Sequence, residues 1–180
     1  MISGKPLVSI IIVNFNVWKM IESCLQSILH HCNGCSFEII VVDNASTDCS
    51  ATNLPGMFPE IKFIANQKNV GFGAANNQGI ILSKGEYILL LNPDTVLLED
   101  PFPDLISFMA EHTDAGMISY RLLSGDKSIQ PTTYTLPNVF GEFCHFFNLK
   151  SLVRSKIIHK YLSTFGWLLG KNIRSYLNST

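Results

Sequence analysis

The stretch Leu7–Asn16, which reads LVSIIIVNFN, decides the fold. Apart from Ser9, its first seven residues are apolar and mostly β-branched, as expected of a strand that is buried on both faces. The run is far shorter than the ~20 apolar residues of a membrane-spanning helix. Asn14 and Asn16 follow it at once, without the small-residue cleavage site of a signal peptide. We therefore predict that a buried strand opens the domain, and we expect a cytoplasmic protein.

Strand and helix patterns alternate over the first 120 residues, which predicts an α/β layered domain. Further strands are expected at residues 37–42, 61–65 and 87–91. Helices are expected at 17–32 with Asn16 as its cap, between the Ser46–Asp48 cap and Pro55-Gly56, at 71–83 with Gly85 just past its end, and from Asp100-Pro101 onward. Residues 124–127 are expected to form a hairpin turn.

The charge is distributed unevenly along the 180 residues. Residues 1–142 hold all 14 acidic residues and seven basic ones, a formal net charge of −7, whereas residues 143–180 hold six basic residues and no acidic one. This basic, aromatic-rich tail is compatible with peripheral contact to acidic lipid headgroups at the inner face of the cell membrane, or with a solvated or disordered end.

The five cysteines include a single C-x-x-C pair, Cys32 and Cys35, without the partner pair or histidine spacing of a zinc site. We expect reduced thiols.

Polar residues gather directly after three of the predicted strands, in the segments Asn14–Asn16, Asp43–Ser46 and Asn92–Asp94. In open α/β sheets the ligand crevice lies outside the carboxyl ends of the strands. Three such clusters at one edge therefore predict a single ligand site.

Two carboxylates in these clusters have both a functional and a structural interpretation. Asp43 suits a donor group of a base or ribose, and equally suits a helix cap or turn. Asp94, with the neutral oxygen of Asn92 beside it, suits Mg²⁺, although Asn-Pro-Asp is also strong turn chemistry.

A glycine-rich segment, Asn69–Asn77, joins the third strand to a helix. Gly71 and Gly73 would let a ligand approach the backbone, and the helix start offers free N–H groups to anionic oxygens. It is not a dinucleotide fingerprint, because Asn76 stands where the third glycine would fall. A tightly packed helix start is the alternative.

Four segments together resemble the family 2 glycosyltransferases of the GT-A fold, especially the bacterial rhamnosyltransferase-like branch. They are Val8–Asn16, Glu38–Asp48, Asn69–Asn77 and Leu89–Thr95, in the family's order and spacing over roughly residues 7–130. The resemblance implies a Rossmann-like sandwich with a mostly parallel sheet and flanking helices. It also implies a nucleotide-sugar-binding core at residues 1–135, followed by a basic, partly helical tail at 136–180 that begins an acceptor-side region.

The resemblance also implies roles for particular residues. Asn14 and Asn16 would line the nucleotide pocket, and Asp43 would accept a hydrogen bond from the base, with Ser46 nearby. The donor's ribose and diphosphate would be bordered by three residues of the glycine-rich segment, Gly71, Gly73 and Asn76. Asn92-Pro93-Asp94 resembles a DxD motif, with Asp94 as the ligand of a divalent cation, Mg²⁺ or Mn²⁺.

The implied reaction is inverting transfer of a sugar from a dTDP- or UDP-linked donor to a cell-surface glycan or lipid-linked acceptor, as in polysaccharide biosynthesis for the cell envelope. No nucleic-acid partner is expected. Because no acidic residue follows Glu142, we expect the catalytic base beyond residue 180. The alternative is an inactive fragment that still binds the donor. A nucleotidyltransferase is disfavoured, since Asn14-Phe15-Asn16 is not a basic, glycine-rich loop.

Overall fold

The computed structural model describes residues 5–130 of the chain. The elements follow one another as β1 (Val8–Asn14), α1 (Trp18–His31), β2 (Phe37–Asp43), α2 (Ser50–Met57), β3 (Lys62–Ala65), α3 (Phe72–Leu82), β4 (Tyr87–Leu91) and α4 (Phe102–Glu111). The chain divides into two compact units, Met1–Tyr120 and Arg121–Thr180. The predicted limit at residue 135 and the predicted basic tail lie outside the described residues and stay predictions.

The four strands form one parallel sheet in the order β3-β2-β1-β4. β1 lies at its centre, and all seven of its residues are buried, which explains why its sequence is apolar throughout rather than alternating. The register pairs Asn14, the last residue of β1, with Asp43, the last residue of β2. The polar residues that follow the two strands therefore begin at the same level of the sheet edge.

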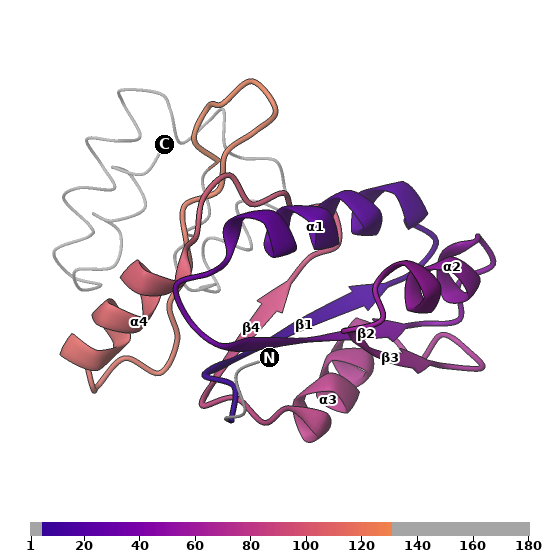
Figure 1. Cartoon of the computed structure of the whole chain (residues 1–180), viewed down its shortest axis with the longest axis horizontal. Coiled ribbons are helices and arrows are strands. Elements are labelled where there is room, and N and C mark those ends of the chain that lie inside the picture. Colours follow the sequence, from indigo (N-terminus) through magenta and orange to yellow (C-terminus); the bar gives the residue numbers. More distant parts are fainter. Residues whose placement is uncertain (1–4, 131–180) are drawn as a thin grey trace, which may run out of the picture. The chain divides into compact units, whose positions relative to one another are not determined.

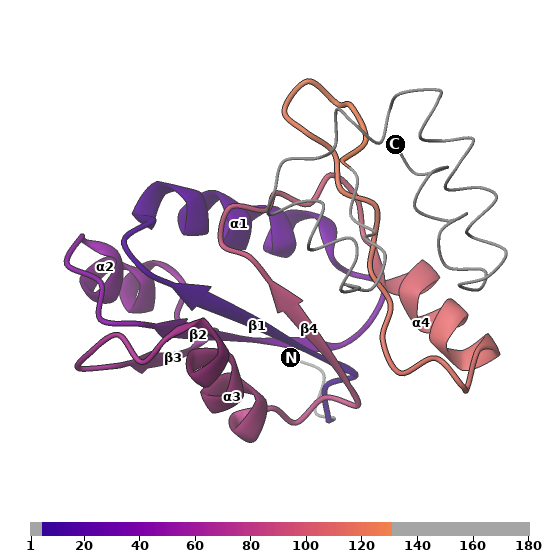
Figure 2. The same ribbon diagram turned by 180° about the vertical axis from the view of Figure 1, so that it is seen from behind.

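Helices cover both faces of the sheet, with α1 and α2 on one face and α3 on the other (Figures 1 and 2). The larger core lies under α1 and includes Ile10 and Ile12 of β1, Leu25 of α1 and Phe102 of α4. The smaller core lies under α3 and is formed by Val13, Ile40, Val42 and Ala75. The α/β layered architecture predicted from the alternating pattern is confirmed.

Two predicted helix boundaries are wrong. Asn16 does not cap α1, because its side-chain oxygen instead accepts hydrogen bonds from Thr47, and Val17 occupies the cap position without a side-chain bond. Pro55 does not end α2 but lies inside it. Because proline has no N–H, this helix of eight residues lacks the hydrogen bond that position 55 would donate, but the helix continues to Met57.

Gly85 is required by close packing rather than as a left-handed helix cap. Its φ is not positive, and an added Cβ would lie 2.5 Å from the backbone nitrogen of Ser9 in β1. The turn predicted at Ser124–Lys127 is present, closed by a hydrogen bond from Lys127 N to Ser124 O of 2.8 Å and flanked by an antiparallel bridge between Leu123 and Ile129. No helix among residues 5–130 has the length and apolarity that crossing a membrane demands.

Candidate active site at the carboxyl edge of the sheet

The centre of the site is a buried polar cluster where β1 and β2 end. Asn14 is fully buried, and its Nδ2 lies 2.7 Å from Asp43 Oδ1, 2.8 Å from Ser50 Oγ and 3.1 Å from Ser46 Oγ. Because a carboxylate only accepts hydrogen bonds, the amide nitrogen rather than the oxygen must face Asp43. The Asn14 side chain therefore ties β1 to the segment that follows β2.

Asp43 is also buried, with 1% of its surface exposed. Besides the bond from Asn14, its Oδ2 accepts from the backbone N–H of Ser46 at 2.9 Å, and its Oδ1 lies 3.5 Å from the Ser50 hydroxyl. A carboxylate offers about four acceptor positions, so one remains for a ligand. At this exposure a ligand reaches it only if neighbouring residues move.

The loop after β2 is locked to the loop after β1. Asn16, with a φ of 55°, accepts from the backbone N–H of Thr47 at 2.7 Å and donates its own N–H to Ser46 Oγ at 3.0 Å. Asp48 accepts from Trp18 N at 2.9 Å and from Ser50 N at 3.0 Å. Burial acts to raise the pKa of Asp48, but the hydrogen bonds from Ser50 and Trp18 outweigh it and hold that pKa below its usual value.

Hydrogen-bonded amide side chains connect the residue after β2 to the glycine-rich segment. Asn44 donates from Nδ2 to Asn69 Oδ1 at 2.8 Å and accepts at Oδ1 from Val70 N at 3.0 Å and from Asn66 Nδ2 at 3.2 Å. Asn69 Oδ1 in turn accepts from Gly71 N at 2.9 Å. The position of the segment that starts α3 is thus fixed from β2.

The start of α3 presents open backbone. Gly71 has a φ of 87°, which a residue with a Cβ adopts only under strain, and neither Gly71 nor Gly73 has a heavy atom within 4 Å of the place its Cβ would occupy. No side chain caps this helix, so the N–H groups of its first turn are available to anionic oxygens. Asn76, by contrast, is buried and donates from Nδ2 to its own helix at Phe72 O, 3.0 Å away.

The loop after β4 carries Asn92 and Asp94, both exposed. Residues of α1 contact the backbone of this loop. The Cys24 thiol lies 3.9 Å from Asn92 O, and the Ser27 hydroxyl accepts from Leu97 N at 3.0 Å. Burial first, and then the negative charge of Asp94, raise the pKa of Cys24 to about 12. This thiol is therefore a neutral packing group beside the loop rather than a nucleophile.

The residues present fit a divalent cation that is shared with a ligand. The described residues contain no cluster of three or more His, Cys, Asp or Glu side chains that could hold a metal. Within that part of the chain, however, the Asp94 carboxylate makes no hydrogen bond or ion pair, and the Asn92 amide is exposed beside it. Mg²⁺ commonly takes one or two protein carboxylates, with waters and phosphate oxygens completing its shell.

The structure brings most of the predicted site residues to one edge of the sheet, although their assigned roles stay predictions. Sequence reasoning missed Ser50, Cys24 and Ser27, and it placed Asn44 in a polar cluster without its contact to Asn69. The Asn44–Asn69 contact joins residues 25 positions apart, and no local pattern signals it. Ser50 had a detectable signal, since it follows Asp48 in a polar run at the end of a predicted strand.

Comparison with known proteins identifies the family to which this chain belongs. The chain matches the family described as "Glycosyl transferase family 2" over residues 9–166. It therefore belongs to glycosyltransferase family 2, and its parallel sheet with flanking helices is the GT-A fold that the sequence resemblance predicted.

Two curated relatives carry related descriptions. The chain is 31% identical over 120 residues to a PGL/p-HBAD biosynthesis glycosyltransferase of Mycobacterium bovis, which covers 64% of the chain and 46% of the relative. It is 30% identical over 118 residues to the putative glycosyltransferase EpsH of Bacillus subtilis, covering 64% and 34%. Among solved structures, S. aureus TarS 1-349 in complex with UDP-GlcNAc matches with a TM-score of 0.52 and 25% identity over 59% of the chain and 32% of TarS. The chain thus spans less than half the length of these relatives.

Proposed function

We propose that this chain supplies the donor-binding half of an inverting glycosyltransferase that uses a dTDP- or UDP-linked sugar. The observation that carries the proposal is the pairing of two exposed features at one sheet edge. These are the uncapped, sterically open start of α3 at Gly71 and the carboxylate of Asp94 after β4, which has no partner among residues 5–130. One suits the diphosphate oxygens directly, and the other suits a cation that bridges them.

The proposal gives each site residue a role that is compatible with the geometry. Asn14, Asn16 and Ser46 shape the nucleotide pocket, and Asp43 accepts from the base at its remaining acceptor position. The open backbone at Gly71 and Gly73 would border the diphosphate. Asn76 would support the start of α3 beside the donor, because its amide is hydrogen-bonded within its own helix.

Asp94, with Asn92, would hold Mg²⁺ or Mn²⁺. The bound cation would neutralise negative charge that develops on the departing nucleoside diphosphate. The protein's contribution is to fix the carboxylate, through the contacts of α1 with the Asn92–Leu97 loop. TarS, crystallised with UDP-GlcNAc, supports a nucleotide-sugar donor.

For the acceptor we propose a cell-surface glycan or a lipid-linked precursor, which places the enzyme in the cytoplasm at the inner face of the membrane. The relative from Mycobacterium bovis, whose description names PGL/p-HBAD biosynthesis, supports an acceptor of this general kind.

The test is calorimetric titration of the chain with UDP and dTDP, with and without Mn²⁺. We expect metal-dependent binding of at least one nucleotide, loss of its metal-dependent part in Asp94→Asn, and wild-type binding in the control Asp114→Asn, which removes an equally exposed carboxylate. Equal metal dependence in Asp94→Asn and wild type would refute the metal assignment. An assay of donor hydrolysis then separates an active transferase from an inactive donor-binding fragment, because both bind nucleotide.

A further inference from the structure

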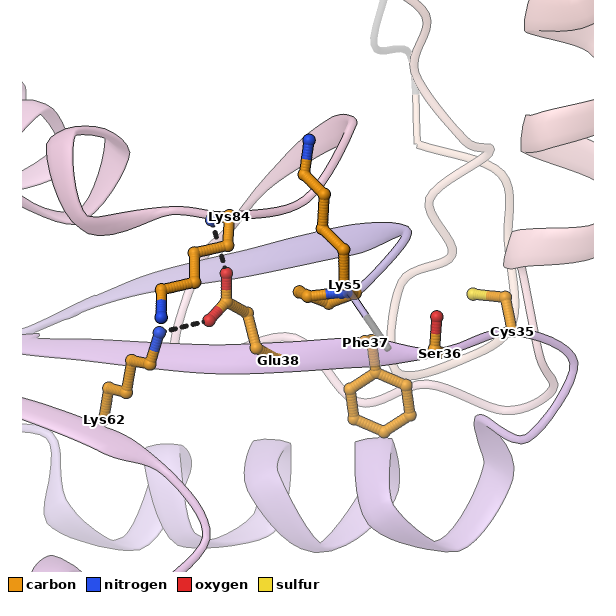
Figure 3. A pocket seen from close by; sticks show the side chains of 8 residues that line it. Lys5, Cys35, Ser36, Phe37, Glu38, Lys62 and Lys84 are labelled. Atoms are coloured by element: carbon orange, nitrogen blue, oxygen red, sulfur yellow. Dashed lines mark hydrogen bonds and ion pairs between the residues drawn. The ribbon is translucent and has the colours of Figure 1, made fainter. Parts of the chain in front are cut away.

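A pocket of about 630 Å³ lies at the amino end of the sheet (Figure 3). Its lining includes Ser36 and Phe37 at the start of β2, with Lys5, which precedes β1. The donor site lies at the opposite, carboxyl end. At about 3.3 Å per residue, the seven residues of β1 separate the two ends by roughly 20 Å. This pocket is therefore distinct from the donor site.

Three lysines from three separate segments line this pocket, and Figure 3 shows the Lys5 side chain extending away from those of Lys62 and Lys84. Lys5 precedes β1, Lys62 begins β3, and Lys84 lies between α3 and β4. Glu38 is the single acidic residue that lines it. The lining thus carries a formal net charge of +2.

Glu38 forms its ion pair with Lys62, so it does not pair with the ammonium groups of Lys5 and Lys84. Its Oε2 lies 2.5 Å from Lys62 Nζ, and its Oε1 accepts from the Ser9 hydroxyl at 2.7 Å and from the backbone N–H of Lys84 at 2.6 Å. Burial acts to raise the pKa of Glu38, but these hydrogen bonds outweigh it and hold that pKa below its usual value. Among the described residues, the ammonium groups of Lys5 and Lys84 have no ion-pair partner.

Glu38 connects two of the three segments that carry the lysines. The Glu38 side chain is 13% exposed and bonds to both the side chain of Lys62 and the main chain of Lys84. Figure 3 shows the ends of the Lys62 and Lys84 side chains on the same side of this carboxylate. The Ser9 hydroxyl accepts from Gly85 N at 2.8 Å and fixes the same loop to β1.

The unengaged groups of the pocket are mainly donors. Besides the ammonium groups, Ser36 Oγ accepts from Leu7 N at 3.1 Å and keeps its own O–H for donation. A phosphate group, with up to two negative charges and three terminal oxygens, matches this donor set better than a singly charged carboxylate does.

We propose that this pocket is a second anion site, which binds a phosphate group of a soluble phosphate compound or of a lipid headgroup. The site is independent of the proposed donor site, and either can be present without the other.

The first test is a titration of the ¹⁵N-labelled chain with inorganic phosphate, followed by NMR, in wild type, Lys5→Gln/Lys84→Gln and the charge-matched control Lys19→Gln/Lys127→Gln. We expect saturable shifts at the amides of Ser36 and Gly85 in wild type and control. Loss of two partly exposed charge contacts should weaken the affinity about tenfold in the pocket variant. Unchanged affinity in that variant, or shifts confined to the carboxyl end of the sheet, would overturn the proposal.

The second test distinguishes the two sources of phosphate by co-sedimentation with vesicles of phosphatidylglycerol or of phosphatidylcholine. Binding to phosphatidylglycerol alone that the pocket variant loses identifies a lipid headgroup. Phosphate shifts without vesicle binding identify a soluble ligand. If phosphate shifts and vesicle binding are both the same in the pocket variant and wild type, the proposal is wrong. Asp94→Asn should leave all these readouts unchanged, so that failure of the donor site is recognised separately.

Discussion

Exchanging the two partners of the buried amide–carboxylate pair offers a sharp test of the cluster at the carboxyl edge. Asn14 Nδ2 lies 2.7 Å from Asp43 Oδ1, and both residues are at most 1% exposed. Asn14→Asp replaces this bond with two buried carboxylates in contact. The loss of a hydrogen bond to a charged group and the unpaired buried charge together should lower the free energy of unfolding by about 4 kcal/mol at pH 7.

Asp43→Asn should lower the free energy of unfolding by less, about 2 kcal/mol. The new amide group would face the Asn14 amide nitrogen, a second donor, but it introduces no charge. The double variant Asn14→Asp/Asp43→Asn restores complementary groups. The carboxylate at position 14 would accept from the hydroxyls of Ser46 and Ser50 and from the amide at position 43, whose oxygen would still accept from Ser46 N. We expect the free energy of unfolding of the double variant to lie within about 1 kcal/mol of that of wild type.

The assay is urea denaturation followed by circular dichroism, combined as a double-mutant cycle. The reasoning predicts a favourable coupling free energy of about 5 kcal/mol between the two positions, the sum of the two single losses less the residual loss of the double variant. Additive effects would show that the pair does not interact as the geometry states. As a second readout, the contact raises the folded-state pKa of the carboxylate pair in Asn14→Asp. The loss of stability in that variant should therefore shrink as the pH falls and one of the two carboxyls binds a proton.

Three further predictions concern parts of the chain around the site. Gly85→Ala places a Cβ 2.5 Å from a backbone nitrogen of β1 and should lower the free energy of unfolding by about 2 kcal/mol. The control Gly56→Ala has open space at its Cβ and should unfold like wild type. Thermal unfolding of the two variants checks this prediction. Burial acts to raise the pKa of Asp100, but three backbone N–H groups outweigh it and lower that pKa. Its stabilisation is thus present above the unfolded pKa of about 3.9 and is lost as the pH falls through the folded value, and urea midpoints in Asp100→Asn should depend less on pH in that range. Buried Cys24, with its pKa raised to about 12, should resist alkylation at pH 8 while exposed Cys49 reacts, as peptide mapping by mass spectrometry would show.

Much of the fold could be predicted because its signals are local. The run at residues 7–13 is apolar without alternation, which is the signature of a strand with helices on both sides, and β1 has that environment. β4 matches the predicted range at both ends, because Gly85 precedes it and Asn92-Pro93 follows it. Likewise, the polar residues after three strands were predicted to share one edge of the sheet, and the parallel register brings them to that edge.

The errors arose where a distant partner competes with a local preference. Asn16 has the sequence context of a helix cap, but the parallel register brings Thr47 within 2.7 Å of its side-chain oxygen, and that contact replaces the cap. Gly85 stands where a helix-ending glycine is common, yet its cause is the approach of β1. Such contacts depend on how strands are ordered in the sheet, which local sequence does not encode.

The position of α1 has a consequence for ligand binding. Near its start, the Trp18 N–H is bonded to Asp48 in the loop after β2, and two turns later Cys24 and Ser27 hold the loop after β4. One rigid helix thus braces both sides of the carboxyl edge. The conformational entropy that each loop loses is consequently lost once, when the chain folds, and not again each time a ligand arrives.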